Sequence, residues 1–123
     1  MKDTIIWQRV EGALVFVAAL ALFATSGSDL PWWAALLLFF APDLSFFTYA
    51  MGPRIGSWGY NLVHVYAFGL GLLAIGSLMA LPLLVGLGAL WLGHCGFDRM
   101  LGYGLKSETS FQDTHLGRIG KKK

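Results

Sequence analysis

The fold is decided by the stretch LPLLVGLGALWLGHCGFDRMLGYG, residues 81–104, in which an apolar run ends in ionisable residues. Residues 81–92 carry no charge, whereas His94, Asp98 and Arg99 follow within the next seven positions. A helix needs about 20 apolar residues to cross the roughly 30 Å of hydrocarbon in a bilayer. The stretch therefore predicts a membrane-spanning helix whose final turns carry polar side chains.

The composition of the whole chain also indicates a membrane protein. Hydrophobic residues make up 56% of the 123 residues and charged residues only 13%, whereas a soluble domain usually carries about 25% charged residues. A soluble protein of this size would expose the excess as large apolar patches. We therefore expect one integral membrane domain that has the lipid bilayer as its partner and binds no nucleic acid.

Turn signals divide the chain into four apolar segments. The segments TSGSDLP, residues 25–31, and GPRIG, residues 52–56, contain the residue types that end helices. We predict an all-α, four-helix transmembrane bundle over residues 1–106, with spans at about 5–25, 31–51, 57–78 and 81–103, and a short polar and basic cytoplasmic tail over 107–123. The spans must be helical, because lipid offers the backbone no hydrogen-bond partners.

The charged residues predict the orientation of these spans. With four spans, the two termini and the middle loop share one side, and every Lys and Arg falls there: Lys2, Arg9, Arg54, Arg99, Lys106, Arg118, Lys121, Lys122 and Lys123. The opposite side carries only Asp29. Because Lys and Arg favour cytoplasmic loops, we expect a multi-pass protein of the cell inner membrane with both termini in the cytoplasm.

Polar residues of three predicted spans lie at one depth. At about 1.5 Å per residue, Asp43, His64 and His94 lie about 11–14 Å from the cytoplasmic ends of their helices. Asp98 follows His94 by four residues and shares its helix face. Charges at this depth cost roughly 2.5 kcal/mol or more, so we expect these side chains to point inward. Pro42 lacks a backbone donor and predicts a kink directly before Asp43.

Two imidazoles and two carboxylates form a ligand set that suits zinc, manganese or iron. We predict that Asp43, His64, His94 and Asp98 bind a divalent metal, which would supply hydroxide near neutral pH from a bound water. Three residues below this layer are candidates for acid, base or supporting contacts, with the first preferred as general base: Glu11, Tyr49 and Asn61. A haem held by the two histidines is less favoured, because the carboxylates would lie against a largely apolar macrocycle.

The tail adds two further candidates. The segment FQDTHLG, residues 111–117, is too short and polar to span a membrane. Its Asp113 and His115 are candidates for a lid that folds back or for additional metal ligands. Asp113 has a simpler alternative role as the cap of a turn.

Three functions stay open on this pattern. The first is a membrane-embedded, metal-dependent hydrolase with a lipid-like substrate that enters sideways from the cytoplasmic leaflet. The second is a small transporter or ion-coupled carrier with Asp43 and Glu11 as protonation sites, although the outer half of the bundle lacks polar residues to complete a path. The third is a structural partner subunit, with a hydrogen-bonded network in place of a metal. A homo-oligomer also stays open, because glycines thin the third and fourth helices.

Several motifs occur in an order that resembles one family. They are RVEG at 9–12, APDLS at 41–45, GPR at 52–54, YNLVH at 60–64, HCGFDR at 94–99, GYGLK at 102–106 and DTHLG at 113–117. From about Arg9 to Ile119, the chain resembles the family of small bacterial membrane proteins catalogued as domain of unknown function 4260. The resemblance implies a compact four-helix membrane protein and implies no activity.

Overall fold

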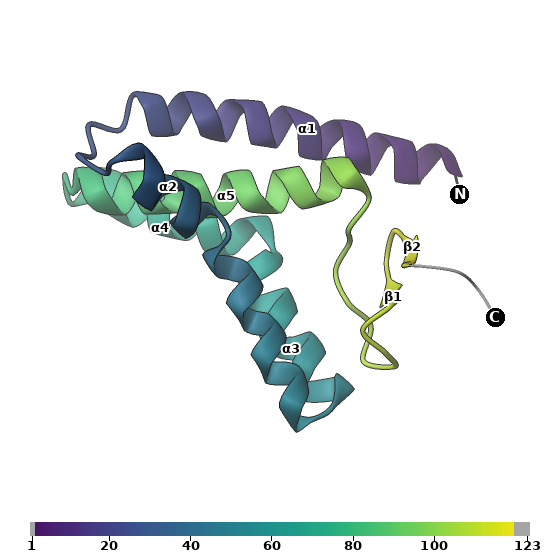
Figure 1. Ribbon diagram of the computed structural model, residues 1–123. Helices are drawn as coiled ribbons and strands as arrows, with labels where there is room; N and C mark the ends of the chain where they lie inside the picture. The colour runs from purple at the N-terminus through teal and green to yellow at the C-terminus, as the bar shows by residue number, and fades with distance from the viewer. Residues whose placement is uncertain (1, 120–123) are drawn as a thin grey trace.

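We describe residues 2–119 in a computed structural model, and Met1 and the basic end of the tail, residues 120–123, lie outside the described part. The described chain is mostly helical, as predicted, and ends in a short hairpin (Figure 1). Its elements are α1 (Lys2–Ala24), α2 (Trp32–Phe39), the 3-10 helix η1 (Ala41–Met51), α3 (Pro53–His64), α4 (Tyr66–Leu78), α5 (Pro82–Leu101), β1 (Asp113–Thr114) and β2 (Gly117–Arg118). The two strands pair antiparallel, with Thr114 opposite Gly117.

The core of the molecule is α5. It runs between α1 and α4, and its buried residues extend from Gly86 to Arg99 (Figure 1). In contrast, α1 buries only Gly12 and Ala19, and α4 only Gly69 and Gly76. The outer faces of these helices carry large exposed hydrophobic side chains. This distribution suits a lipid environment, in which apolar side chains face outward without penalty.

Glycines bring the helix backbones close together. A Cβ added at Gly69 of α4 would lie 2.6 Å from the backbone nitrogen of Leu92 in α5. On the other side of α5, a Cβ at Gly96 would lie 2.7 Å from the backbone carbonyl of Gly12 in α1. Real Cβ contacts are not this short, so only glycine fits at these positions. These glycines therefore serve packing within the chain.

The second predicted span is not a continuous α-helix. It ends as an α-helix at Phe39 and continues as η1 from Ala41, with Pro42 in the first turn. A proline lacks the backbone N–H that a continuing α-helix needs. Runs of 3-10 helix as long as η1 are uncommon and often mark a strained or functional segment. The kink predicted before Asp43 is therefore present as a change of helix type.

The third predicted span is broken as well. It begins at Pro53 instead of residue 57, and it is interrupted at Val65, whose backbone is extended. The two halves, α3 and α4, meet at an angle of 42°. As a result, η1 and α3 form a hairpin that leaves the α1–α5 pair at an angle (Figure 1). The predicted four-helix bundle is therefore not confirmed for this part of the chain.

Side chains of α5 bind the carbonyls that this break exposes. The indole Nε1 of Trp91 donates to the carbonyl of Val63 at 3.0 Å, and Nη2 of Arg99 donates to the carbonyl of His64 at 2.8 Å. The thiol of Cys95 lies 3.6 Å from the same Val63 oxygen. The three donors are four residues apart and share one face of α5. Because an unpaired buried carbonyl costs about 1–3 kcal/mol, this face stabilises the break.

Two helical stretches in the described residues are long and apolar enough to cross a membrane: α1 and residues Trp32–Met51. A third is available if α3 and α4 count as one bent span. Although α5 is 20 residues long, His94, Asp98 and Arg99 lower its hydropathy. The chain is thus a small membrane protein with apolar helices, whereas a bundle of four spans is not confirmed.

Candidate metal centre

The four predicted metal ligands come together where the η1–α3 hairpin meets α5. Asp43 lies in η1, His64 is the last residue of α3, and His94 and Asp98 lie one turn apart on α5. One ligand atom from each residue lies within 4.8 Å of the other three. Both histidines are almost fully buried. The two breaks in the middle helices therefore deliver Asp43 and His64 to the buried face of α5.

Five of the six distances between the four ligand atoms are close to those around a tetrahedral ion. The Oδ1 atom of Asp43 lies 3.1 Å from Nε2 of His94 and 3.3 Å from Nε2 of His64. The two Nε2 atoms are 3.2 Å apart. The Oδ2 atom of Asp98 lies 3.2 Å from Nε2 of His94 and 3.5 Å from Nε2 of His64. Zinc bonds of about 2.0–2.1 Å imply ligand atoms about 3.3–3.4 Å apart in a tetrahedron, so these distances fit a zinc-sized ion.

The tautomers of the two neutral histidine rings leave few hydrogen-bond donors among the four ligand atoms. Nδ1 of His64 lies 2.8 Å from the backbone carbonyl of Tyr60, so in the neutral ring this nitrogen carries the proton and Nε2 presents a lone pair. Both carboxylates are acceptors as well. With neutral rings, only Nε2 of His94 can supply a proton to the four converging atoms. A cation satisfies all four lone pairs together, and the bond from Nδ1 to a carbonyl is typical of a metal-binding histidine.

Aromatic rings fix the two imidazoles. The ring of Tyr60 stacks on His64, with centroids 3.7 Å apart and planes 7° apart, and Phe46 stacks on the far side of Tyr60. The edge of Phe39 contacts His94, with centroids 5.5 Å apart. Nδ1 of His94 has no hydrogen-bond partner among the described residues. Packing therefore holds His94, whereas stacking and a hydrogen bond both hold His64.

A cavity of about 340 Å³ reaches the cluster from the carboxylate side. Its wall includes both carboxylates and neither histidine: Asp43, Phe46, Tyr60, Asp98, Tyr103, Lys106, Phe111 and Ile119. Half of these residues belong to the segment that follows α5. A molecule in the cavity would therefore meet the two carboxylates first and would be enclosed by the tail.

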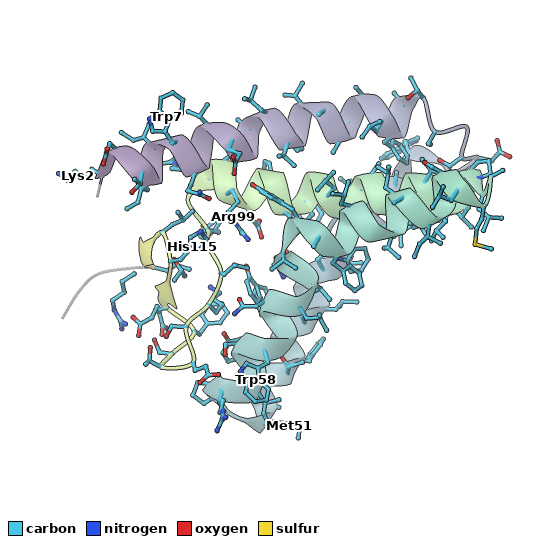
Figure 2. The ribbon with its side chains drawn as sticks, turned by 180° about the vertical axis from the view of Figure 1, so that it is seen from behind. Lys2, Trp7, Met51, Trp58, Arg99 and His115 are labelled. Atoms are coloured by element: carbon cyan, nitrogen blue, oxygen red, sulfur yellow. The ribbon has the colours of Figure 1, made fainter. Side chains whose placement is uncertain are left out.

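The tail, residues 103–119, folds back along α3 beside the cavity, and we call this segment the lid. The helix α5 ends at Gly102, whose φ of 92° lies in the left-handed region that favours glycine. The side chain of Asn61 then binds the backbone of Lys106, donating to its carbonyl at 2.8 Å and accepting from its N–H at 2.7 Å. The indole of Trp58 also donates to the carboxylate of Glu108. Figure 2 shows the tail between Arg99, at the end of α5, and Trp58 on α3.

Asp113 and His115 lie in this lid but do not join the metal ligands. Asp113 accepts hydrogen bonds from Thr109 at 2.7 Å and from Arg118 at 2.6 Å, and these bonds lower the pKa of its carboxyl. Nδ1 of His115 accepts from the N–H of Leu105 at 2.8 Å. Burial lowers the pKa of His115, and the positive charge of Arg99 lowers it further. Both predicted extra ligands are therefore lid residues.

The structure does not bring the three catalytic candidates into the cluster. Glu11 is exposed on α1 and is not one of the four residues whose ligand atoms converge. The hydroxyl of Tyr49 is buried without a partner among the described residues, and its ring contacts Phe111. Asn61 holds the lid through Lys106. Direct proton transfer by Glu11 is thus not supported, and the supporting role predicted for Asn61 takes the form of a lid contact.

Sequence reasoning missed two residues of the site, Tyr60 and Lys106. Tyr60 precedes His64 by four residues, which places the ring against the imidazole on one helix face, so its spacing was a usable signal. Lys106 is only 5% exposed, and its ammonium lies over the rings of Phe111 at 3.8 Å and Tyr60 at 5.0 Å. Burial lowers the pKa of Lys106, although the nearby aspartates oppose this effect.

The comparisons with known proteins agree with the ordered motifs. No curated protein and no solved structure matches the chain. The family described as "Domain of unknown function (DUF4260)" matches residues 5–119, which include all four cluster residues and most of the lid. Since this match covers nearly the whole chain, the protein belongs to the DUF4260 family.

Proposed function

We propose that this protein is a metal-dependent membrane hydrolase in which Asp43, His64, His94 and Asp98 bind one divalent ion. The observation that carries the proposal is the set of five distances of 3.1–3.5 Å among their four ligand atoms. Zinc fits this spacing best, and manganese or iron also suits imidazole and carboxylate ligands. The apolar helices keep the centre in the membrane, where a lipid-like substrate reaches it.

The exposure of Asp43 supports catalysis. A catalytic zinc keeps one position for water, whereas four protein ligands fill a structural site. The Asp43 side chain is 34% exposed and faces the cavity, whereas the Asp98 side chain is 12% exposed. Asp43 is therefore the ligand that can give way to water, whose pKa the ion lowers toward about 7.

The reaction that follows from this arrangement is ester hydrolysis. The water oxygen forms a bond to the electrophilic carbon or phosphorus, and the bond from that atom to the leaving oxygen breaks. With an ion bound by the other three ligands, Asp43 would accept the proton from the water and pass it to the leaving oxygen. One water is consumed, and the products are an acid and an alcohol.

The orientation in the membrane is part of the proposal. We propose that residues 1–106 span the inner membrane four times, with both termini in the cytoplasm, because the Lys and Arg residues collect on one side of that topology. The N-terminal end of α1 and the β1–β2 hairpin lie at the same end of the molecule (Figure 1), which supports this arrangement. The cavity and its lid would then open toward the cytoplasm.

A metal-ion carrier is the second candidate. Its support is that four protein ligand atoms converge within 4.8 Å of one another, and four protein ligands fill a zinc site without water. A carrier needs the ion to reach both sides of the membrane, whereas the cavity at the cluster opens on the carboxylate side and Phe39 packs against His94. The hydrolase therefore agrees better with the described residues.

The proposal is tested by metal content and hydrolysis together. Wild type, His94→Gln, Asp98→Asn and His115→Gln are purified without chelators, and bound zinc, manganese and iron are measured per chain. His115→Gln is the matched control, because it removes the one histidine outside the cluster. We expect about one ion in wild type and in this control, less than a tenth in the other two, and lipid-ester hydrolysis only where the ion is bound.

Two results would contradict the hydrolase. Folded wild type that holds no ion and takes up none of the three added metals would exclude the metal centre. Bound metal without hydrolysis of carboxylic-ester or phosphoester lipids, together with metal uptake into liposomes, would establish the carrier instead.

A further inference from the structure

We propose that the cavity beside the metal centre binds a phosphate group, held between the ion and Lys106, and that the substrate is an amphipathic phosphoester. This inference rests on the proposed metal centre and names the class of ligand that it takes. The residue that carries the inference is Lys106, which has no role in the proposed hydrolysis steps. The side chain lines the same cavity as Asp43 and Asp98.

The side chain of Lys106 lines the cavity, and its ammonium has no acceptor among the described residues. The residue is 5% exposed, and its only described partners beyond the backbone are the rings of Phe111 and Tyr60. Its Nζ forms no hydrogen bond or ion pair within the described residues, although an ammonium offers three donors. An anion in the cavity would supply the acceptors that the protein does not.

The position of Lys106 is fixed by the fold of the lid. The side chain of Asn61 binds both the N–H and the carbonyl of Lys106, at 2.7 and 2.8 Å. The isolated bridge between Lys106 and Thr114 adds a second attachment. Two elements thus hold the backbone of Lys106 while its side chain stays available to the cavity. This arrangement suits a residue that positions a ligand.

The charge of the site favours an anionic ligand. Two carboxylates and one divalent ion cancel, so the ammonium of Lys106 leaves a positive charge beside the centre. A phosphate monoester carries about −1.5 to −2 charge at pH 7. Lysine binds phosphate as a point charge, and a metal ion opposite it stabilises the charge on the transferred phosphoryl oxygens.

The remaining wall of the cavity is mostly aromatic, and two of its five residues, Tyr60 and Tyr103, carry a hydroxyl. Phe46, Phe111 and Ile119 line it, and Phe46 is 41% exposed. A cavity of about 340 Å³ lies at the low end of the usual range for ligand sites, about 300–1,000 Å³. It would hold a phosphate head and the start of a chain, while the rest of the chain leaves past Phe46. A phosphoester lipid has this division of polar and apolar parts.

Binding measurements on zinc-loaded protein in detergent test the inference. The probes are dioctanoyl phosphatidate, dioctanoylglycerol and inorganic phosphate, and the variants are Lys106→Met, Lys106→Arg and the matched control Arg118→Gln, which removes an exposed tail cation. For wild type, we expect phosphatidate to bind at least tenfold more tightly than the uncharged lipid. We expect Lys106→Met to lose at least tenfold of that affinity with its zinc content unchanged, and Lys106→Arg and Arg118→Gln to keep it.

The outcomes separate this inference from the proposed function. Zinc bound in both proteins, with equal phosphatidate affinity in wild type and Lys106→Met, would overturn the inference and leave the metal centre intact. If inorganic phosphate binds as tightly as phosphatidate, the lipid part of the ligand adds no affinity, and the proposal of a lipid substrate is refuted. Failure to load zinc in wild type would instead refute the proposed function. If Lys106→Met fails to fold, Lys106→Gln with normal zinc content makes the same comparison.

Discussion

Asp43 and Asp98 have the same side chain but are held differently. Asp98 lies on the buried face of α5, one turn from His94, and its side chain is 12% exposed. Asp43 lies in the first turn of η1, directly after Pro42, and its side chain is 34% exposed. In the proposed metal centre, Asp98 would therefore be the fixed ligand, and Asp43 the one that exchanges its place with water.

Substitution of Asp43 or Asp98 by asparagine distinguishes the exchangeable ligand from the fixed one. We expect Asp98→Asn to weaken zinc binding by more than about 100-fold, since even residues that only support ligands cost about 10–100-fold. We expect Asp43→Asn to weaken binding less, by about tenfold, and to abolish hydrolysis because the amide accepts no proton. Competition with a zinc chelator measures the affinities, and equal losses in both variants would contradict the distinction.

The sequence could predict that the four candidate ligands converge, but not which residues surround the cavity. Asp43, His64, His94 and Asp98 were identifiable because few ionisable residues lie deep in apolar helices, where their cost requires partners. Lys106 was indistinguishable from the other cationic residues of the tail. Its burial depends on how residues 102–119 return along α3, and that path depends on contacts distant in sequence.

At the level of elements, the helix break at Pro42 could be predicted from the sequence and the break at Val65 could not. Pro42 predicts the change from α2 to η1, because it lacks the backbone N–H that a continuing α-helix needs. Val65 carries no such signal. Its extended backbone is stabilised by Trp91 and Arg99 of α5, which are too distant in sequence for a local pattern to reveal. The third predicted span was therefore placed as one helix where the structure has two.

The contact between α4 and α5 depends on Gly69. We expect Gly69→Ala to destabilise the folded protein by about 1–3 kcal/mol, because the added Cβ meets the backbone of Leu92 and the helices must separate. Gly71 is the matched control in the same helix, since a Cβ there meets nothing within 4 Å. Gly71→Ala should be neutral or stabilising by up to about 1 kcal/mol. Unfolding in mixed detergent measures both, and equal effects would contradict this packing.

Acid should loosen the lid at His115. The pKa of this residue lies below its usual 6.5, because burial and the charge of Arg99 disfavour the cation. The folded lid therefore binds fewer protons than the open one, so its stability is full above pH 6.5 and falls as the pH drops below that value. Protonation of Nδ1 also removes the acceptor for the N–H of Leu105.

Hydrogen exchange of residues 103–118 checks this pH dependence. After correction for intrinsic exchange rates, protection in wild type should be lower at pH 5.5 than at pH 7.5. His115→Gln should remove most of this pH difference. A difference of the same size in the variant would show that another group controls the lid.

On the scale of the whole molecule, the prediction of an apolar, helical membrane protein is confirmed, and the regular bundle is not. The composition determines the first result, since 56% hydrophobic residues cannot be buried inside 123 residues. The second result depends on the two breaks, which turn the η1–α3 hairpin away from α1 and α5 (Figure 1). That hairpin creates the space in which the cavity and the lid lie.

Cysteine labelling tests the proposed topology. Asp29 and Gln112 are both exposed, and the native Cys95 is buried. In intact spheroplasts, a membrane-impermeant maleimide should label Asp29→Cys, whereas it should label Gln112→Cys only after permeabilisation. Wild type should stay unlabelled in both conditions. Labelling of Gln112→Cys from outside would contradict cytoplasmic termini.

X-ray absorption spectroscopy of the zinc-loaded protein tests the metal centre most directly. We expect one ion per chain with four or five nitrogen and oxygen ligands at about 2.0–2.1 Å. We also expect outer-shell scattering from two imidazoles, those of His64 and His94. A sulfur ligand, an all-oxygen shell without imidazole scattering, or a folded protein that retains no zinc would contradict it.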